Sequence, residues 1–60
     1  MNNYSVYQEM WKNYMNWVKT FYGSNYKNER GAYKAAHRYA KKLQEKTGGV
    51  YYVIKDEYDE

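Results

Sequence analysis

Tyrosine is the residue that most constrains what this chain can fold into. Ten of the sixty residues are tyrosine, whereas the chain holds one leucine (Leu43), one isoleucine (Ile54) and four valines. So few aliphatic side chains cannot form a core of ordinary composition, and tyrosine has to supply much of the packing. A buried tyrosine needs a partner for its hydroxyl group or an edge open to water. Because tyrosine and tryptophan also dominate binding energy at protein surfaces, the composition indicates a small interaction module.

The length predicts a single small domain over residues 1–60, near the lower limit for folding without a staple. A core of this size contributes roughly 3–5 kcal/mol of net stability. The chain has no cysteine and one histidine, His37, so the sequence predicts no disulfide, no metal site and no cofactor. A mean hydropathy of −1.24, with no long apolar run, predicts a cytoplasmic protein without a membrane span or signal peptide.

The spacing of apolar residues predicts an amphipathic helix over residues 4–22. Ser5 and Gln8 have the spacing of a capping box, and Gly23 is a natural stop. At about 100° per residue, the apolar side chains fall on one half of the helix and the polar ones on the other. The apolar half comprises Val6, Tyr7, Met10, Trp11, Tyr14, Met15, Trp17, Val18, Phe21 and Tyr22.

A second helix is predicted over residues 29–46, after a loop at 24–28. Its central stripe is small and apolar, and it complements the bulky stripe of the first helix. The predicted core therefore places Trp11, Tyr14, Val18 and Phe21 against Ala32, Ala36, Tyr39 and Leu43. The short loop favours an antiparallel arrangement. The predicted fold class is mainly α: an antiparallel two-helix hairpin with a short C-terminal β-strand or extended arm.

That strand is predicted over residues 50–55, where five consecutive β-branched or aromatic residues follow Gly48-Gly49. Residues 56–60 form an acidic tail that is expected to fray. On this interpretation the chain offers no second strand, so Val50–Ile54 pairs with its copy in a homodimer or with an edge strand of another protein. The alternative is an extended arm packed over the two helices.

The outer face of the second helix is basic. Lys34, His37, Arg38, Lys41 and Lys42 project together, and residues 1–55 carry ten basic and three acidic side chains, a net charge of +7. Such a face, with tyrosine nearby, suits phosphate backbones and bases. Lysine is also common on solvated helix surfaces, and Lys41, Lys42 and Lys46 suit the negative end of the helix dipole. Nucleic acid is therefore the second candidate ligand.

Catalytic patterns are missing from the sequence. Within the predicted helices no carboxylate is spaced to pair with His37, and the chain has no cysteine nucleophile, phosphate-binding loop or metal-ligand spacing. Surrounded by lysine and arginine, His37 is interpreted as a solvated surface residue. The sequence predicts that the protein is not an enzyme.

The last half of the chain resembles the small orphan proteins that bacteriophages encode. The resemblance lies in Tyr33-Lys34-Ala35-Ala36 and in Tyr39-Ala40-Lys41-Lys42-Leu43, which leads through Lys46-Thr47-Gly48-Gly49 into Tyr51-Tyr52-Val53-Ile54. The bias toward Asn, Lys and Tyr is similar to that of AT-rich phages of Firmicutes. The resemblance implies a compact protein in the host cytoplasm that binds and blocks a host machine, as anti-CRISPR and other counter-defence inhibitors do. It assigns no functional residue.

These observations predict a non-enzymatic protein-binding module, an inhibitor of a host machine such as a CRISPR nuclease or a polymerase. The alternatives are a nucleic-acid-binding accessory protein, which uses the basic helix, and a structural homodimer. The predicted partner-binding residues combine exposed aromatic side chains, the basic face and the strand. They are Trp17, Tyr22, Tyr26, Lys34, Arg38, Lys41, Lys42, Tyr51 and Val53.

Overall fold

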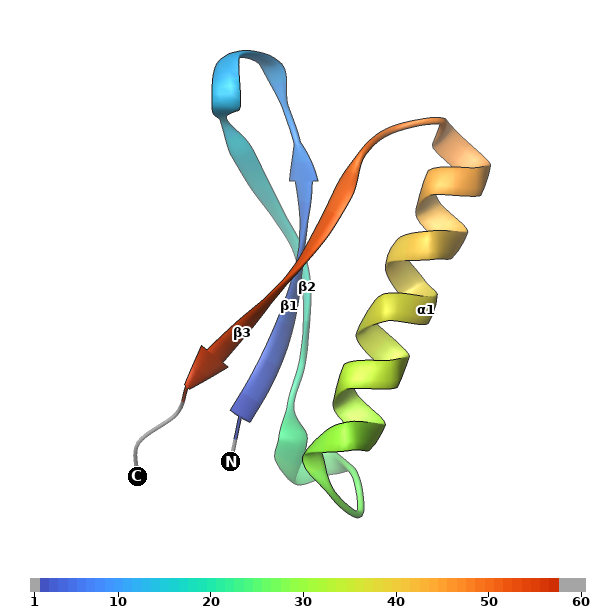
Figure 1. The fold of residues 1–60 in the computed structure, drawn as a ribbon. Coiled ribbons are helices and arrows are strands. Elements are labelled where there is room, and N and C mark those ends of the chain that lie inside the picture. The colour runs from blue at the N-terminus through green and yellow to red at the C-terminus, as the bar shows by residue number, and fades with distance from the viewer. Residues whose placement is uncertain (1, 58–60) are drawn as a thin grey trace.

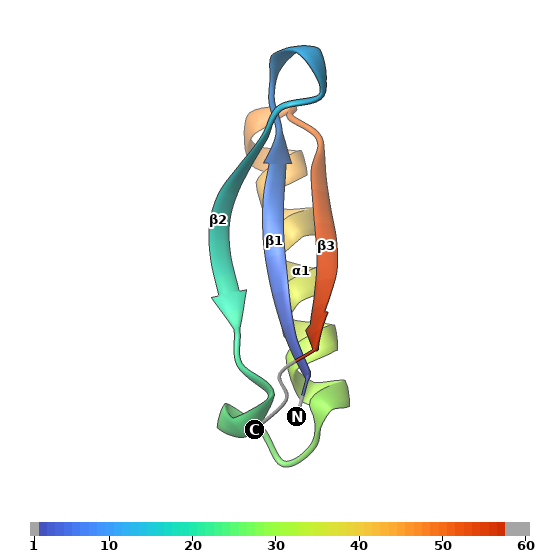
Figure 2. The same ribbon diagram turned by 90° about the vertical axis from the view of Figure 1, so that its left-hand side faces the viewer.

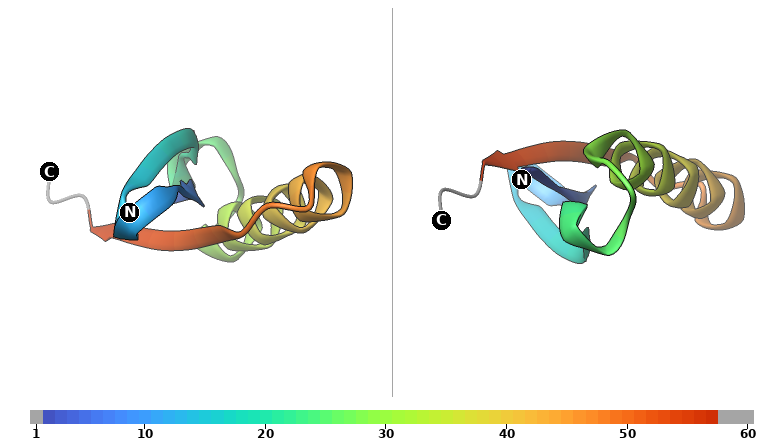
Figure 3. Two further views of the ribbon diagram at one scale, coloured as in Figure 1. Left: turned by 90° about the horizontal axis from the view of Figure 1, so that it is seen from above. Right: turned by 90° about the horizontal axis from the view of Figure 1, so that it is seen from below.

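Three strands and one helix make up the part of the chain that the computed structural model describes, residues 2–57 (Figure 1). In chain order they are β1 (Asn2–Glu9), β2 (Met15–Phe21), α1 (Glu29–Thr47) and β3 (Tyr51–Glu57), with short 3₁₀ turns η1 (Trp11–Asn13) and η2 (Gly23–Asn25). The strands form one antiparallel sheet in the order β2-β1-β3, with β1 in the centre (Figure 2). The helix covers one face of the sheet and leaves the other uncovered (Figure 3).

The two-helix hairpin predicted from the sequence is wrong, because a β-hairpin replaces the helix expected over residues 4–22. Residues 1–22 contain no alanine and no leucine, the best helix formers, but are rich in tyrosine, valine and tryptophan. The fold is therefore α/β, with one helix packed on a three-stranded sheet. Serine and glutamine with capping-box spacing, Ser5 and Gln8, lie within β1 and cap no helix.

A tight turn joins β1 to β2. Lys12 and Asn13 both have positive φ angles, 57° and 65°, and the Tyr14 N–H donates to the Trp11 carbonyl oxygen at 3.3 Å. Two consecutive residues with positive φ are the signature of a type I′ turn, whose twist matches that of the flanking strands. Asparagine tolerates this backbone conformation better than most residues. The polar pair Lys12-Asn13 thus divides the apolar stretch into two strands.

The central strand, β1, pairs with both of its neighbours, β2 and β3. The register of β1 against β3 runs without interruption from Asn2 opposite Glu57 to Gln8 opposite Tyr51. The expectation that the C-terminal strand finds no partner within its own chain is therefore wrong. Asp56 and Glu57 belong to β3, so the predicted frayed tail is wrong for these two residues, and the rest of that prediction, 58–60, lies outside the described residues. The register of β1 against β2 shifts between Val6 and Tyr7, where Val18 is the extra residue of a β-bulge.

Helix α1 lies where the sequence predicts a helix over residues 29–46. The Asn28 side chain accepts a hydrogen bond from the Gly31 N–H at 3.2 Å, which caps the first turn. Gly48 ends the helix in the left-handed conformation, with φ at 75°. The residues that α1 buries are the alanines Ala32, Ala36 and Ala40, so the helix backbone approaches the sheet closely.

The core lies between α1 and the helix-facing side of β1. Val6 is fully buried and Tyr4 nearly so, and both pack with the three alanines. Half-buried apolar side chains surround this cluster: Val18, Phe21, Tyr26, Tyr39, Tyr51 and Val53. The sequence placed Trp11 and Tyr14 in the core, and this is wrong because both lie at the hairpin tip, where Trp11 is 81% exposed.

Tyr4 contributes to the packing of the core, and its hydroxyl group has a hydrogen-bond partner. Tyr4 contacts the Tyr33 ring edge-to-face at 5.5 Å, and its hydroxyl group donates to a carboxylate oxygen of Glu29 at 3.1 Å. The Asn2 amide donates to the same Glu29 oxygen at 2.6 Å. Hydrogen bonds from Asn2 and Tyr4 hold the pKa of Glu29 below its ordinary value, whereas burial and the neighbouring Glu29 raise the pKa of Tyr4.

We expect Glu29 to make folding sensitive to acid. Because its pKa is lower in the folded than in the unfolded chain, its contribution is complete above the ordinary glutamate pKa of about 4.3. The contribution is lost as pH falls through the folded-state value. Chemical denaturation of Glu29→Gln between pH 7 and pH 3 should show a weaker pH dependence than the unchanged protein. Equal pH dependence of the two proteins would contradict the assigned role of Glu29.

Candidate functional site

The uncovered face of the sheet carries a cluster of exposed aromatic and apolar side chains. Successive residues of a strand point to opposite faces. Tyr4 and Val6 face α1, so Tyr7 faces away, and its cross-strand neighbours are Trp17 on β2 and Tyr52 on β3. We call the side chains that share this side of the sheet the open face, which Figure 2 views directly. They are Asn3, Ser5, Tyr7, Glu9, Met15, Trp17, Thr20, Tyr52, Ile54 and Asp56.

An aromatic row crosses the centre of the open face, because Trp17, Tyr7 and Tyr52 occupy directly opposed positions on the three strands. Trp17 is 57% exposed and Tyr52 is 42% exposed. Beside this row, Ile54 is 40% exposed, and Met15 is also exposed. Exposed apolar side chains gathered on one surface are typical of interaction sites.

The β-bulge fixes the orientation of Trp17. Trp17 and Thr20 are three residues apart, so they would point to opposite faces of a regular strand. The extra residue, Val18, brings both side chains to the open face, where the Trp17 indole Nε1–H donates to the Thr20 hydroxyl oxygen at 2.8 Å. The indole therefore has a satisfied polar edge and an exposed ring.

That hydrogen bond begins a chain that crosses all three strands. The Ser5 hydroxyl group donates to a carboxylate oxygen of Asp56 at 2.7 Å, which uses its one proton. The Thr20 hydroxyl group, 2.8 Å from Ser5, is consequently the donor to Ser5. The hydrogen bonds thus run in one direction, from Trp17 through Thr20 and Ser5 to the carboxylate of Asp56. Successive hydrogen bonds in such a chain polarise and strengthen one another.

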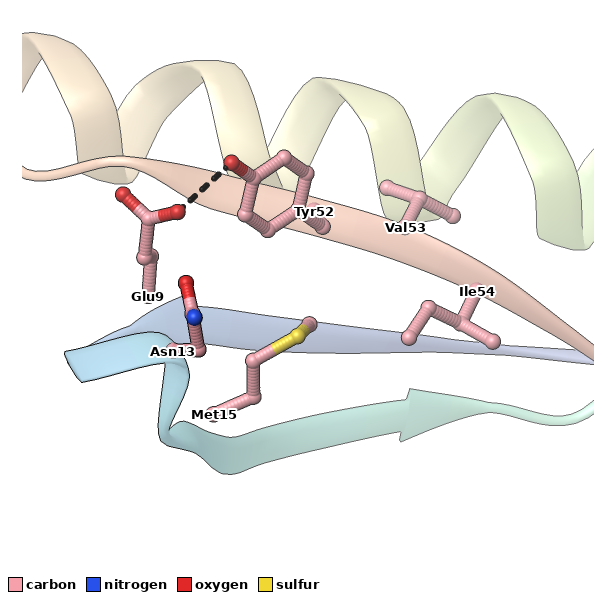
Figure 4. Close-up of a pocket in the computed structure, with 6 residues that line it drawn as sticks. All are labelled: Glu9, Asn13, Met15, Tyr52, Val53 and Ile54. Atoms are coloured by element: carbon pink, nitrogen blue, oxygen red, sulfur yellow. Dashed lines mark hydrogen bonds between the residues drawn. The ribbon is translucent and has the colours of Figure 1, made fainter.

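Tyr52 is held in a similar way. Its hydroxyl group donates to Glu9 Oε1 at 2.9 Å, and this hydrogen bond to the carboxylate raises the pKa of Tyr52. The pair borders a hollow of about 370 Å³. Figure 4 shows Met15 and Ile54, from the two outer strands, reaching toward each other over β1 in this hollow. Its lining consists of Glu9, Asn13, Met15, Tyr52, Val53 and Ile54.

The basic residues predicted to bind a partner lie on the other layer of the molecule. Lys34, Arg38, Lys41 and Lys42 are exposed, and helical spacing directs them away from the buried alanines. The structure brings these four together on one helix face. It separates them from Trp17, because the sheet stands between.

The remaining predicted residues occupy other places. Tyr22 is exposed at the end of β2, and Tyr26 is half-buried where its ring meets Gly31. Tyr51 and Val53 are half-buried, and both pack against the core on the α1 side of the sheet. These positions therefore form no single site with Trp17.

Three exposed apolar residues of the open face were absent from the predicted contact residues: Met15, Tyr52 and Ile54. Met15 was assigned to the stripe of a helix that the structure does not contain. Tyr52 and Ile54 carried a usable signal, because alternation along β3 places them together on the face opposite Tyr51 and Val53. The sequence does not state which of these faces the helix covers.

Within residues 2–57, no cluster of three metal-ligating side chains occurs. In the same range, no helix has the length and apolar character needed to cross a bilayer. Comparison with protein-family models, curated proteins and solved structures returned no match to this chain. The candidate site therefore depends on its own geometry: an aromatic face of the sheet whose two most exposed rings are fixed by hydrogen bonds.

Proposed function

We propose that this protein is a non-enzymatic protein-binding module that docks through the open face of its sheet. The observation that carries the proposal is the aromatic row of Trp17, Tyr7 and Tyr52, whose two outer rings are exposed on the side of the sheet away from α1. Tryptophan and tyrosine are the residues most enriched at binding hot spots. Burial of the row against a partner would remove its apolar surface from water.

Preorganisation supports this role. Binding immobilises side chains, at a cost of about 0.5–1.5 kcal/mol for each flexible one. The bond from Trp17 to Thr20 and the bond from Tyr52 to Glu9 already restrict the two rings in the free protein. Their polar atoms are also satisfied, so a partner can cover the rings without leaving an unpaired donor.

Charge favours a protein over nucleic acid at this face. Single-stranded nucleic acid is bound where aromatic rings and positive charge share one groove. Among residues 2–57, the open-face positions include two acids, Glu9 and Asp56, but no lysine or arginine. The exposed rings and the basic helix therefore point in opposite directions. A partner surface that is apolar with lysine or arginine at its rim fits the open face best.

The same charges disfavour a homodimer through this face. Two open faces packed together would bring Glu9 and Asp56 of both copies into one dehydrated layer, where like charges repel. A different protein is therefore the proposed partner. Inhibition of a host machine extends the proposal: binding of the partner would block a surface that the partner needs for its own activity. The cytoplasm is the compartment proposed for this encounter.

The test compares three proteins in capture experiments from bacterial lysate, with both the proteins and the nucleic acids that they retain identified. They are the unchanged protein, an open-face variant (Trp17→Thr with Ile54→Thr) and a helix-face variant (Lys34→Gln, Arg38→Gln and Lys41→Gln). All substituted positions are exposed, so circular dichroism should show that each variant folds. We expect a protein partner that the helix-face variant retains and the open-face variant loses.

With the purified partner, Trp17→Ala alone should weaken binding by about 30-fold or more, the size of a hot spot of 2 kcal/mol. Isothermal titration calorimetry measures this loss. Retention of the partner by the open-face variant would overturn the proposal. Dimerisation of the unchanged protein that the open-face variant abolishes would support the structural homodimer instead.

Nucleic acid remains a second candidate because Lys34, Arg38, Lys41 and Lys42 lie together on the exposed side of α1. Phosphate contacts by such residues give binding that is indifferent to sequence and weakens steeply with salt. If this function is the correct one, the helix-face variant binds duplex or single-stranded nucleic acid of random sequence more weakly than the unchanged protein. Its affinity for nucleic acid also depends less steeply on salt concentration. Tight binding of random nucleic acid near physiological salt would favour this candidate over the protein partner.

A further inference from the structure

The outer edge of β3 pairs with no other strand of residues 2–57 and lies apart from the open face. In an antiparallel ladder, residues alternate between those bonded to the neighbouring strand and those whose N–H and C=O groups point outward. The Glu9 N–H donates to the Val50 carbonyl oxygen at 2.8 Å, which places Val50 among the inward-bonded residues. Counting along β3, the backbone groups of Tyr51, Val53 and Lys55 point away from β1.

An independent contact agrees with this alternation. The Tyr51 N–H donates to the Gln44 side-chain oxygen at 3.1 Å, so it does not face β1. Helix α1 thereby satisfies the first outward N–H group of the strand. Within residues 2–57, the outward N–H and C=O groups of Val53 and Lys55 pair with no further strand, and such a row is a template for an added strand.

The two edges of the sheet differ in how well they could accept a strand. The edge strand β2 is interrupted by the bulge at Val18 and carries Lys19 beside it, and both features discourage pairing. The register of β3 is regular over its seven residues. An added strand therefore fits β3 better than β2.

A groove runs beside this edge. It measures about 500 Å³ and lies between β3 and α1, with the small side chain of Ala40 among its lining residues. The helix contributes His37, Ala40, Lys41 and Gln44, and the strand contributes Tyr51, Tyr52 and Val53. When a peptide adds to an edge, the backbone supplies affinity, and pockets for alternate side chains supply specificity. Here the groove would receive those alternate side chains.

The charge of the groove identifies the complementary peptide. Lys41 lines the helix side of the groove, and Lys34 and Arg30 continue the same ridge at helical spacing. Among the residues that the structure describes, no carboxylate lines this groove. Acidic side chains on the incoming strand would therefore meet positive charge, whereas basic ones would be repelled.

We propose that an extended acidic segment of a protein partner adds to β3 as a fourth strand, with alternate side chains in the groove against α1. This site is distinct from the open face, and the proposal does not depend on the function proposed above. Bound in this way, the segment would use the free backbone groups of Val53 and Lys55.

Selection from a library of random ten-residue peptides tests the proposal with the folded protein as bait. We expect enrichment of peptides with aspartate or glutamate at alternate positions. In the complex, the Val53 and Lys55 amides should become protected from hydrogen exchange, as nuclear magnetic resonance would show. Failure to enrich acidic peptides, or enrichment without protection of these two amides, would overturn the proposal.

The variant Val53→Pro supplies the sharpest control. Because the Val53 N–H points outward, proline there removes no bond to β1, and proline is tolerated at such edge positions. Peptide binding should nevertheless fall by more than about tenfold through the lost hydrogen bond and the misfit of the ring. Ile54→Pro, one residue on, removes a bond to β1 and should unfold the protein.

A second variant keeps the test decisive if Val53→Pro folds poorly. Lys41 is exposed on α1, and Lys41→Glu should weaken the binding of acidic peptides by about three- to tenfold. It should also shift selection away from acidic sequences. Unchanged selection by Lys41→Glu would refute the charge argument. Concentration-dependent protection of Val53 and Lys55 without any peptide would show that a second copy, rather than a foreign segment, occupies the edge.

Discussion

Val6→Asp should leave the protein unfolded at room temperature. Val6 is fully buried at the centre of β1, beneath α1. An aspartate there would place an unpaired carboxylate in the core, at a cost of several kcal/mol. The whole stability expected at this length is only roughly 3–5 kcal/mol. Far-ultraviolet circular dichroism should show loss of both helix and sheet.

The matched control is the same substitution at Val50, which is 45% exposed just before β3. Val50→Asp should change the free energy of unfolding by no more than about 0.5 kcal/mol, as is usual at surface positions. A folded Val6→Asp, with a cooperative melt like that of Val50→Asp, would contradict the assignment of the core to the helix-facing side of β1.

Ala36→Leu should have the second largest effect, this time by overfilling. Ala36 is fully buried between α1 and the sheet, and its small size allows the helix to approach. Extra carbon atoms there force a shift of the helix or strained rotamers, which typically costs about 1–3 kcal/mol. Urea denaturation should show a midpoint lowered by a large fraction of its original value.

Its control lies one residue earlier. Ala35 is only half-buried, at the side of the helix, so a leucine there can extend toward solvent. Ala35→Leu should leave stability nearly unchanged. Equal destabilisation by the two substitutions would mean that α1 is rotated relative to the arrangement described above.

The second half of the chain could be predicted because local preference and pattern agree there. Residues 29–47 combine alanine, lysine, glutamate and leucine with a capping asparagine and a terminal glycine, and Tyr51–Ile54 is uniformly β-prone. The boundaries of helix α1 differ from the prediction by one residue at its end. Strand β3 is longer than expected and continues into the acidic residues Asp56 and Glu57.

The first half could not be predicted from helical periodicity alone. Each strand alternates over only a few residues, and the bulge at Val18 shifts the alternation by one position. The resulting spacing of apolar residues imitates a helical stripe. Intrinsic preference gave the opposite indication, because residues 1–22 lack alanine and leucine. Once the hairpin was missed, β3 lost its partner strand in the prediction.

For the candidate site, the sequence predicted the residue types but not their arrangement. Exposed tyrosine and tryptophan and a basic helix were expected, but which side of each strand the helix covers depends on long-range packing. Tyr51 and Val53 were therefore chosen as contact residues, although Tyr52 and Ile54 occupy the open face. The hydrogen bond from Trp17 to Thr20 depends on the bulge, which the sequence pattern did not reveal.

The position of β1 has a consequence for synthesis of the protein. This strand is made before both of its partners, and one of them, β3, follows only after the helix. A growing chain can form the hairpin and the helix early, but the sheet closes only when residues 51–57 have left the ribosome. Until then the unpaired edge of β1 is exposed to other nascent chains, and such unpaired edges favour aggregation. Rapid translation of residues 48–57, or a chaperone near the exit tunnel, should therefore increase the yield of folded protein.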